Sequence, residues 1–246
     1  MHLIGKPSAA AETLPDTYDY SDVEMINHQT LGEQVYQQLR QMLIAGRFHP
    51  GEKITLRSMA KALGTSPMPV RDALRQLMVE QSIELVNSRA FRVPIMTLKR
   101  FTEIRDIRLK LEGMAVQEAA RKIGQDHLDE VRRVGNVFAD ECDRETPNRS
   151  LLIQSNQEFH FLIYRAADMP VLMRLIEGLW TQIGPVLNLD IAEGSARITN
   201  KVPVKHHNAL VLALEQRDPS LAATALATDI CAAGEHILNK GVLPDH

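Results

Sequence analysis

Basic side chains are concentrated in one segment near the N-terminal end of the chain. Residues 31–95 contain nine Lys/Arg and five Asp/Glu, a net charge of +4, whereas the whole 246-residue chain has a net charge of −3. A guanidinium group can bind a phosphate or the O6/N7 edge of a guanine in the major groove of DNA. Because local basicity is what contact with a phosphate backbone requires, this segment is the candidate for DNA binding.

The spacing of these side chains places them at the points where a DNA-reading motif needs them. Arg71 and Arg75 are four residues apart and therefore share one face of a helix, while the apolar Val70 and Leu74 face the other way. Arg57 begins the preceding helix and is suited to hold the backbone. Arg89 and Arg92 lie in a hairpin, where minor-groove or phosphate contact is expected. The predicted DNA-binding residues are Arg57, Ser66, Met68, Arg71, Arg75, Arg89 and Arg92.

The elements that position these residues follow from apolar periodicity and turn signals. Thr30 with Glu33 resembles a capping box at the start of a first helix. Ser66 can cap the second of two short helices, with Pro69 in its first turn. The expected helices are 30–46, 56–63 and 67–80, and the expected strands are 53–55, 83–87 and 91–95. Two short helices followed by a two-stranded ribbon describe a winged helix-turn-helix.

The segment PGEKITLRSMAKALGTSPMPVRDALRQLMVEQSIELVNSRAFRV resembles the winged-helix signature of the GntR family of bacterial regulators. The resemblance spans about 60 residues and implies DNA contacts by Arg57, Ser66, Arg71 and the wing residue Arg89. The sequence departs from that pattern in three places. Pro67 replaces a base-reading polar residue, Ala90 replaces the wing glycine, and Ser82 stands where a glycine commonly closes the recognition helix.

From Thr97 onward the pattern is helical throughout. Aromatic residues make up only 4% of the chain, so aliphatic side chains must fill the interior, which favours helix packing. Pro185 lies inside the fourth of these helices and is expected to kink or split it. The expected helices are 98–123, 125–143, 149–167, 169–192, 204–216 and 218–239. The predicted fold is therefore mainly α: a mobile arm (1–28), a winged helix (29–96) and an all-helical domain of about six helices (97–246).

The helical region resembles the FCD effector domain of the FadR branch of that family, on Arg108 with Leu111-Glu112, Phe159-His160, His207 and Asp218. The resemblance implies a divalent-metal site, whose four positions fall on Asn156, His160, His207 and Asp229. Two of these positions depart from the family set, since Asn156 replaces an Asp and Asp229 replaces a His. Two imidazoles, a carboxylate and an amide oxygen would suit Zn, Ni, Mn or Fe, with open positions for water or ligand.

The same resemblance implies that Arg108 faces this cavity and pairs with the carboxylate of a small organic acid. The alternative is an intrahelical pair with Glu112, four residues along the helix.

These features predict a cytoplasmic transcription regulator, a repressor, that binds a double-stranded DNA operator. The resemblance implies that it does so as a homodimer under the control of a small carboxylate effector. The two distant cysteines, Cys142 and Cys231, fit a reducing compartment, and no apolar run reaches the length of a membrane span. Two alternatives remain open at this point. One is a metal-dependent hydrolase built on the His/His/Asp set, and the other is a regulator whose helical domain only dimerises.

Overall fold

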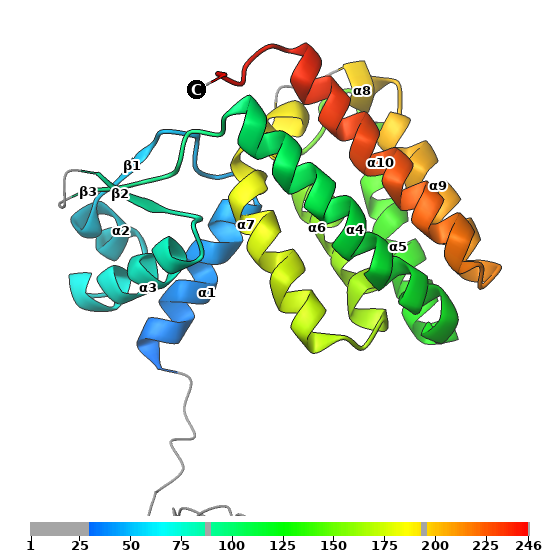
Figure 1. Ribbon diagram of the computed structural model, residues 1–246, viewed down its shortest axis with the longest axis horizontal. Coiled ribbons are helices and arrows are strands. Elements are labelled where there is room, and N and C mark those ends of the chain that lie inside the picture. The colour runs from blue at the N-terminus through cyan, green and yellow to red at the C-terminus, as the bar shows by residue number, and fades with distance from the viewer. Residues whose placement is uncertain (1–29, 87–89, 193–195, 246) are drawn as a thin grey trace, which may run out of the picture.

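A computed structural model describes residues 30–86, 90–192 and 196–245. Two parts lie side by side, a small winged helix and a larger bundle of helices (Figure 1). The expected arm at 1–28 lies outside the described residues.

The winged helix has the elements that the sequence predicts, with shorter strands. Its sheet is antiparallel in the order β1-β3-β2, with Lys53 opposite Arg92 and Leu85 opposite Phe91. Phe91 and Leu74 belong to the core that α1, α2, α3 and the sheet enclose. Its elements are α1 (Leu31–Ile44), β1 (Lys53–Ile54), α2 (Leu56–Ala62), α3 (Pro67–Val79), β2 (Glu84–Val86) and β3 (Ala90–Arg92).

Helix caps agree with the sequence only in part. The Thr30 hydroxyl accepts a hydrogen bond from the backbone N–H of Glu33, but the Glu33 carboxylate binds Gln37, so only half of the capping box forms. Ser66 occupies the N-cap position of α3, yet its side chain makes no capping hydrogen bond. The reason is that Pro69 stands at the third helical position and has no N–H to offer. The Ser66 hydroxyl is therefore left for another partner.

The end of α3 corrects one sequence assignment. The left-handed residue that follows the helix is Gln81, with φ of 58°, and not Ser82. Ser82 is instead 1% exposed, and its hydroxyl forms a 2.6 Å hydrogen bond with Thr181 Oγ1 of the helical bundle. The position that favours glycine is thus Gln81, and Ser82 has a contact role that the sequence pattern did not indicate.

The helical bundle follows the predicted boundaries closely. In the part of the chain that is described, one short helix, α8, was not expected. The expected split at Pro185 does not occur, since α7 is continuous through it although Pro185 cannot donate to the carbonyl of Thr181. The helices are α4 (Leu98–Lys122), α5 (Gln125–Cys142), α6 (Arg149–Ala166), α7 (Pro170–Ala192), α8 (Ala196–Thr199), α9 (Val202–Glu215) and α10 (Pro219–Asn239).

The two parts meet where α7 packs against α1 (Figure 1). A Cβ atom on Gly184 would lie 2.5 Å from the carbonyl oxygen of Leu43, so only glycine allows the two helix backbones to approach this closely. Asn188 Nδ2 donates to the carbonyl of Ile44 at 2.6 Å, and Arg40 pairs with Glu177 at 2.5 Å. The winged helix is therefore seated on α7 by close packing and polar contacts.

By length and composition, α10 would be long and apolar enough to cross a membrane. It packs along α4 and α9 and carries the buried Asp229, as the core helix of a helical bundle does. Such a single helix is weak evidence for a membrane span.

Candidate DNA-binding surface and candidate metal and effector site

The exposed face of α3 carries the predicted DNA-reading residues. Arg71 and Arg75 are exposed, whereas Val70 and Leu74 on the opposite face are completely buried. Met68 is 62% exposed in the first turn of the same helix. Arg57 and Ser66 are exposed as well. The structure thus brings four of the predicted residues, Ser66, Met68, Arg71 and Arg75, to one free helix surface.

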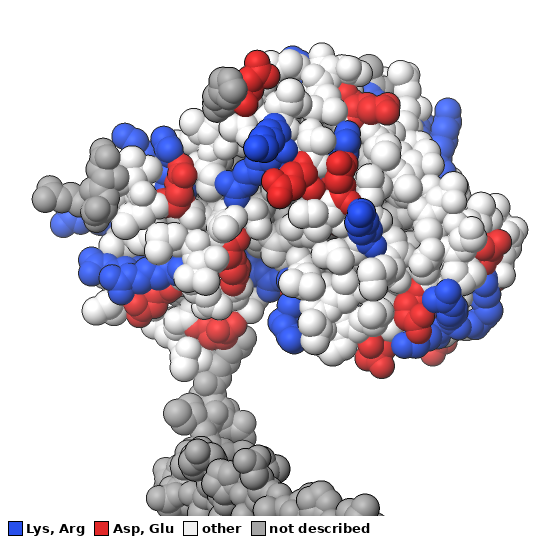
Figure 2. All heavy atoms as spheres, viewed as in Figure 1, with Lys and Arg blue, Asp and Glu red and all other residues white. Residues whose placement is uncertain are grey.

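Of the two predicted wing residues, only Arg92 lies in the described part of the chain. Arg92, on β3, forms an ion pair with Glu84 on β2 at 2.5 Å, and both side chains are partly exposed. Arg89 lies outside the described residues. Lys and Arg side chains gather at the end of the winged helix that lies farthest from the bundle (Figure 2).

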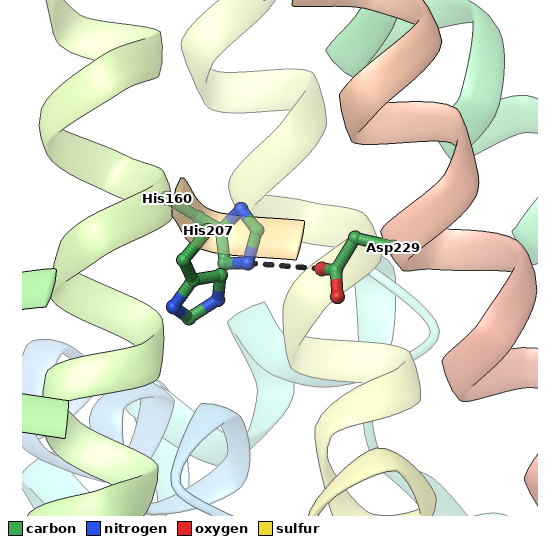
Figure 3. A group of neighbouring side chains, drawn as sticks. All are labelled: His160, His207 and Asp229. Atoms are coloured by element: carbon green, nitrogen blue, oxygen red, sulfur yellow. Dashed lines mark ion pairs between the residues drawn. The ribbon is translucent and has the colours of Figure 1, made fainter. Parts of the chain in front are cut away.

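The candidate metal site lies inside the helical bundle. His160 of α6, His207 of α9 and Asp229 of α10 are buried, and their candidate ligand atoms lie within 4.8 Å of one another (Figure 3). The Nε2 atom of His160 is 3.4 Å from the Oδ2 atom of Asp229. Three different helices therefore place two imidazoles and one carboxylate close together.

His207 is the least satisfied of these groups. It is 2% exposed, and neither of its ring nitrogens has a hydrogen-bond partner. Its ring stacks on Phe159, with centroids 4.1 Å apart. Burial lowers the pKa of His207 to about 3, so the imidazole is neutral and has a lone pair to offer.

Asp229 is held by more partners than the sequence suggested. Its Oδ1 atom lies 3.2 Å from His206 Nδ1 and 3.3 Å from an Nη atom of Arg197. Burial alone would raise the pKa of Asp229, but the hydrogen bonds from His160 and His206 and the nearby imidazoles hold it well below its ordinary value. The carboxylate is therefore ionised, with Oδ2 directed to His160.

A small cavity adjoins this cluster. Asn156, one turn before His160, lines it together with Arg108, Arg197 and Trp180. Its volume of about 30 Å³ corresponds to a single water molecule. The predicted ligand residue Asn156 and the predicted effector residue Arg108 thus reach the same space as His160 and Asp229.

Arg108 forms the pair with Glu112 that the sequence offered as its alternative role, but in a buried setting. Its Nε atom is 2.6 Å from Glu112 Oε1, and its guanidinium stacks 4.8 Å from the ring centre of Trp180. Burial alone would lower the pKa of Arg108, but the charge of Glu112 raises it overall. Glu112 is completely buried and also accepts hydrogen bonds from Tyr164 at 2.5 Å and from the Trp180 indole at 3.0 Å.

Sequence reasoning missed the groups around the predicted residues. His206 is adjacent to His207, but its turn toward Asp229 depends on how α9 and α10 pack. Tyr164 lies four residues after His160, a spacing that places both on one helix face and is visible in the sequence. The pairing of Arg197 and Trp180 with residues from other helices has no sequence signal.

Comparison with known proteins agrees with both parts of the fold. Residues 31–93 match the family described as bacterial regulatory proteins, gntR family, and residues 103–230 match the FCD domain. The HTH-type transcriptional regulator McbR of Escherichia coli (strain K12) is 29% identical over 193 residues, which cover 78% of this chain and 86% of McbR. The "Probable D-xylose utilization operon transcriptional repressor" of Paenarthrobacter nicotinovorans is 31% identical over 206 residues, covering 82% of this chain and 87% of that protein.

Solved structures show the same fold. The structure titled E. coli McbR/YncC has a TM-score of 0.80 at 26% identity and covers 86% of this chain and 99% of that chain. A transcriptional regulator GntR from Rhodococcus sp. RHA1 has a TM-score of 0.67 at 19% identity, with 85% and 97% covered. The matched family and the named relatives are transcription regulators, so the hydrolase alternative is set aside.

Proposed function

Because this chain belongs to the gntR family of bacterial regulatory proteins and has an FCD domain behind its winged helix, we propose that it is a cytoplasmic repressor that binds an operator as a homodimer. A small carboxylate, together with a divalent metal, controls it from the helical domain. Regulation of transcription by DNA binding is what the family does. The proposal adds that this protein represses, that it is a homodimer, and that an effector and a metal control it.

DNA recognition is supported by the free face of α3. Arg71 and Arg75 are exposed, and their side chains hold no other part of the described fold together. Their guanidinium groups are therefore available to base edges or phosphates. A two-fold dimer would place two such helices on the two half-sites of a pseudo-palindromic operator.

The metal proposal rests on His207, whose two buried ring nitrogens have no hydrogen-bond partner. A buried polar group without a partner costs about 1–3 kcal/mol, and an imidazole nitrogen that faces a second imidazole and a carboxylate fits a metal ligand. The residues present therefore fit a divalent cation held by His160, His207 and Asp229, with Asn156 at the edge of the cavity. Bound there, the cation would supply positive charge that attracts an effector carboxylate.

Effector binding has narrower support. Arg108 lines the cavity, but its Nε and one Nη atom already bind Glu112, so a bidentate grip on a second carboxylate requires that pair to open. The cavity of about 30 Å³ must also widen to admit an organic acid. This small volume favours the second candidate, a helical domain that only dimerises.

The DNA proposal is tested with Arg71→Ala. Operator binding should fall sharply at moderate salt while the circular dichroism spectrum and thermal unfolding stay unchanged. The control is Arg133→Ala, because Arg133 on α5 is also exposed but pairs with Glu130, far from α3. Equal affinity of the Arg71→Ala variant and the parent protein would reject α3 as the reading helix.

The metal proposal is tested by elemental analysis and by thermal unfolding of chelator-stripped protein with added Zn²⁺, Ni²⁺, Mn²⁺ or Fe²⁺. Binding to the native state should raise the melting temperature, and the double variant His160→Ala with His207→Ala should show no such rise. His49→Ala, an exposed histidine in the winged helix, is the control and should respond as the parent does. Absence of bound metal and of any shift would reject the site.

The effector proposal is tested by thermal unfolding of the metal-loaded protein with a panel of small mono- and dicarboxylates. At least one should raise the melting temperature and change operator affinity. No shift across the panel would favour the ligand-free alternative.

A further inference from the structure

The first turn of α3 carries an exposed apolar side chain, that of Met68. Met68 is 62% exposed and lies three residues before Arg71, on the face of α3 that is opposite the buried Leu74. Figure 1 shows α3 beginning at the outer edge of the winged helix and ending near α7. Met68 therefore lies at the outer end of the helix.

The same turn is poor in hydrogen-bond donors. Pro67 and Pro69 occupy the first and third helical positions and have no backbone N–H. Of the first three residues of α3, only Met68 therefore has a backbone N–H donor. Pro67 also has no side-chain donor. The two prolines fix the backbone on both sides of Met68, which holds its side chain at a defined place on the helix.

The edges of base pairs in the major groove present one apolar group, the C5-methyl of thymine. A methionine side chain is unbranched and polarizable, so it adapts its shape to such a methyl group. We infer that Met68 reads a thymine methyl group in each operator half-site, at the base pair that faces the start of α3. This inference rests on the proposed function of α3 as the reading helix.

The inference is tested with operators that the protein itself selects from a random duplex library. Each thymine is then replaced in turn by deoxyuridine, which removes the methyl group and keeps Watson–Crick pairing. At one thymine per half-site the dissociation constant should rise about four-fold, the value for one buried methyl-sized group, and about fifteen-fold when both half-sites are replaced.

Variants assign the effect to its residue. Because Met68→Ala removes the side chain from both half-sites of the homodimer, it should weaken binding to the thymine operator by about fifteen-fold, as the double replacement does. The variant should bind the thymine and deoxyuridine operators equally. The matched control is Val79→Ala, because Val79 is also exposed and apolar, at 81%, but lies at the other end of α3. This variant should keep the full sensitivity to the methyl group.

Two outcomes would overturn the inference. In one, every deoxyuridine replacement leaves the dissociation constant within a factor of two. In the other, the sensitivity to the methyl group persists in Met68→Ala. Failure of the parent protein to select any DNA is a different result, because it would count against the proposed function itself.

Discussion

A hydrogen bond between the hydroxyl groups of Ser82 and Thr181 links the winged helix to the helical bundle. Substituting Ser82 and substituting Thr181 should lower the free energy of unfolding by different amounts. Both side chains are buried, and their oxygens are 2.6 Å apart. Thr181 also donates its single hydroxyl proton to the carbonyl of Gly178 at 2.7 Å. The proton between the two residues therefore belongs to Ser82, which donates to Thr181.

This direction fixes the expected order of the substitutions. Thr181→Val keeps the shape but leaves the buried Ser82 donor without an acceptor, which should lower the free energy of unfolding by about 1–3 kcal/mol. Ser82→Ala removes the donor and leaves Thr181 bonded to Gly178, so the loss should be about 0.5–1.5 kcal/mol. In the double variant the unsatisfied donor is absent, and its loss should be smaller than the sum of the two by about 1 kcal/mol.

The measurement is urea unfolding followed by circular dichroism and by tryptophan fluorescence. Trp180 is the only tryptophan of the chain and precedes Thr181 directly, so its emission reports on this junction. A loss for Ser82→Ala that equals or exceeds the loss for Thr181→Val would refute the assigned donor. Additive losses in the double variant would refute the energetic link between the two parts.

Three further predictions concern single residues. Gln81→Gly should raise the free energy of unfolding by about 0.5–1 kcal/mol in a urea titration, because Gln81 has a φ of 58° that glycine adopts without strain; an unchanged or lower value would contradict this. Glu112→Gln should lower it by about 3–5 kcal/mol, since Arg108 is left buried without its carboxylate, whereas a loss below 1 kcal/mol would mean that the pair is dispensable. In metal-free protein, the free energy of unfolding should fall as the pH drops from 6.5 toward about 3. The reason is that His207 stays neutral in the folded protein, whereas the same histidine takes up a proton in the unfolded chain. The slope should reach up to about 1.4 kcal/mol per pH unit. His207→Phe should flatten that slope, and a slope that is equal in the variant would exclude His207 as its source.

Much of the fold was predictable because the helices obey local rules. The predicted ends of α4, α5 and α10 agree with the structure to within one or two residues, since capping residues, glycines and prolines mark them directly. The predicted strands were longer than the observed ones because pairing in the small sheet, and not the apolar run, decides where a strand ends. Of the two outcomes expected at Pro185, a kink or a split, the split does not occur, since the packing of α7 against α1 and α4 holds the helix together across the missing hydrogen bond.

The candidate site was predictable at the level of residues and not of contacts. The sequence pointed to Asn156, His160, His207 and Asp229, and the structure places all four at or beside one cavity. The sequence did not show that Asp229 is shared with His206 and Arg197.

By itself, the sequence determined the type of protein and the exposed face of α3, because helical periodicity separates Arg71 and Arg75 from the core residues Val70 and Leu74 without any knowledge of tertiary contacts. Only the tertiary structure decided the state of the buried groups. Arg108 could either face a ligand or bind Glu112, and the choice depends on Tyr164 and Trp180, which come from two other helices. The charge and hydrogen bonding of a buried group are set by what surrounds it in space, and spacing along the chain carries no record of those neighbours.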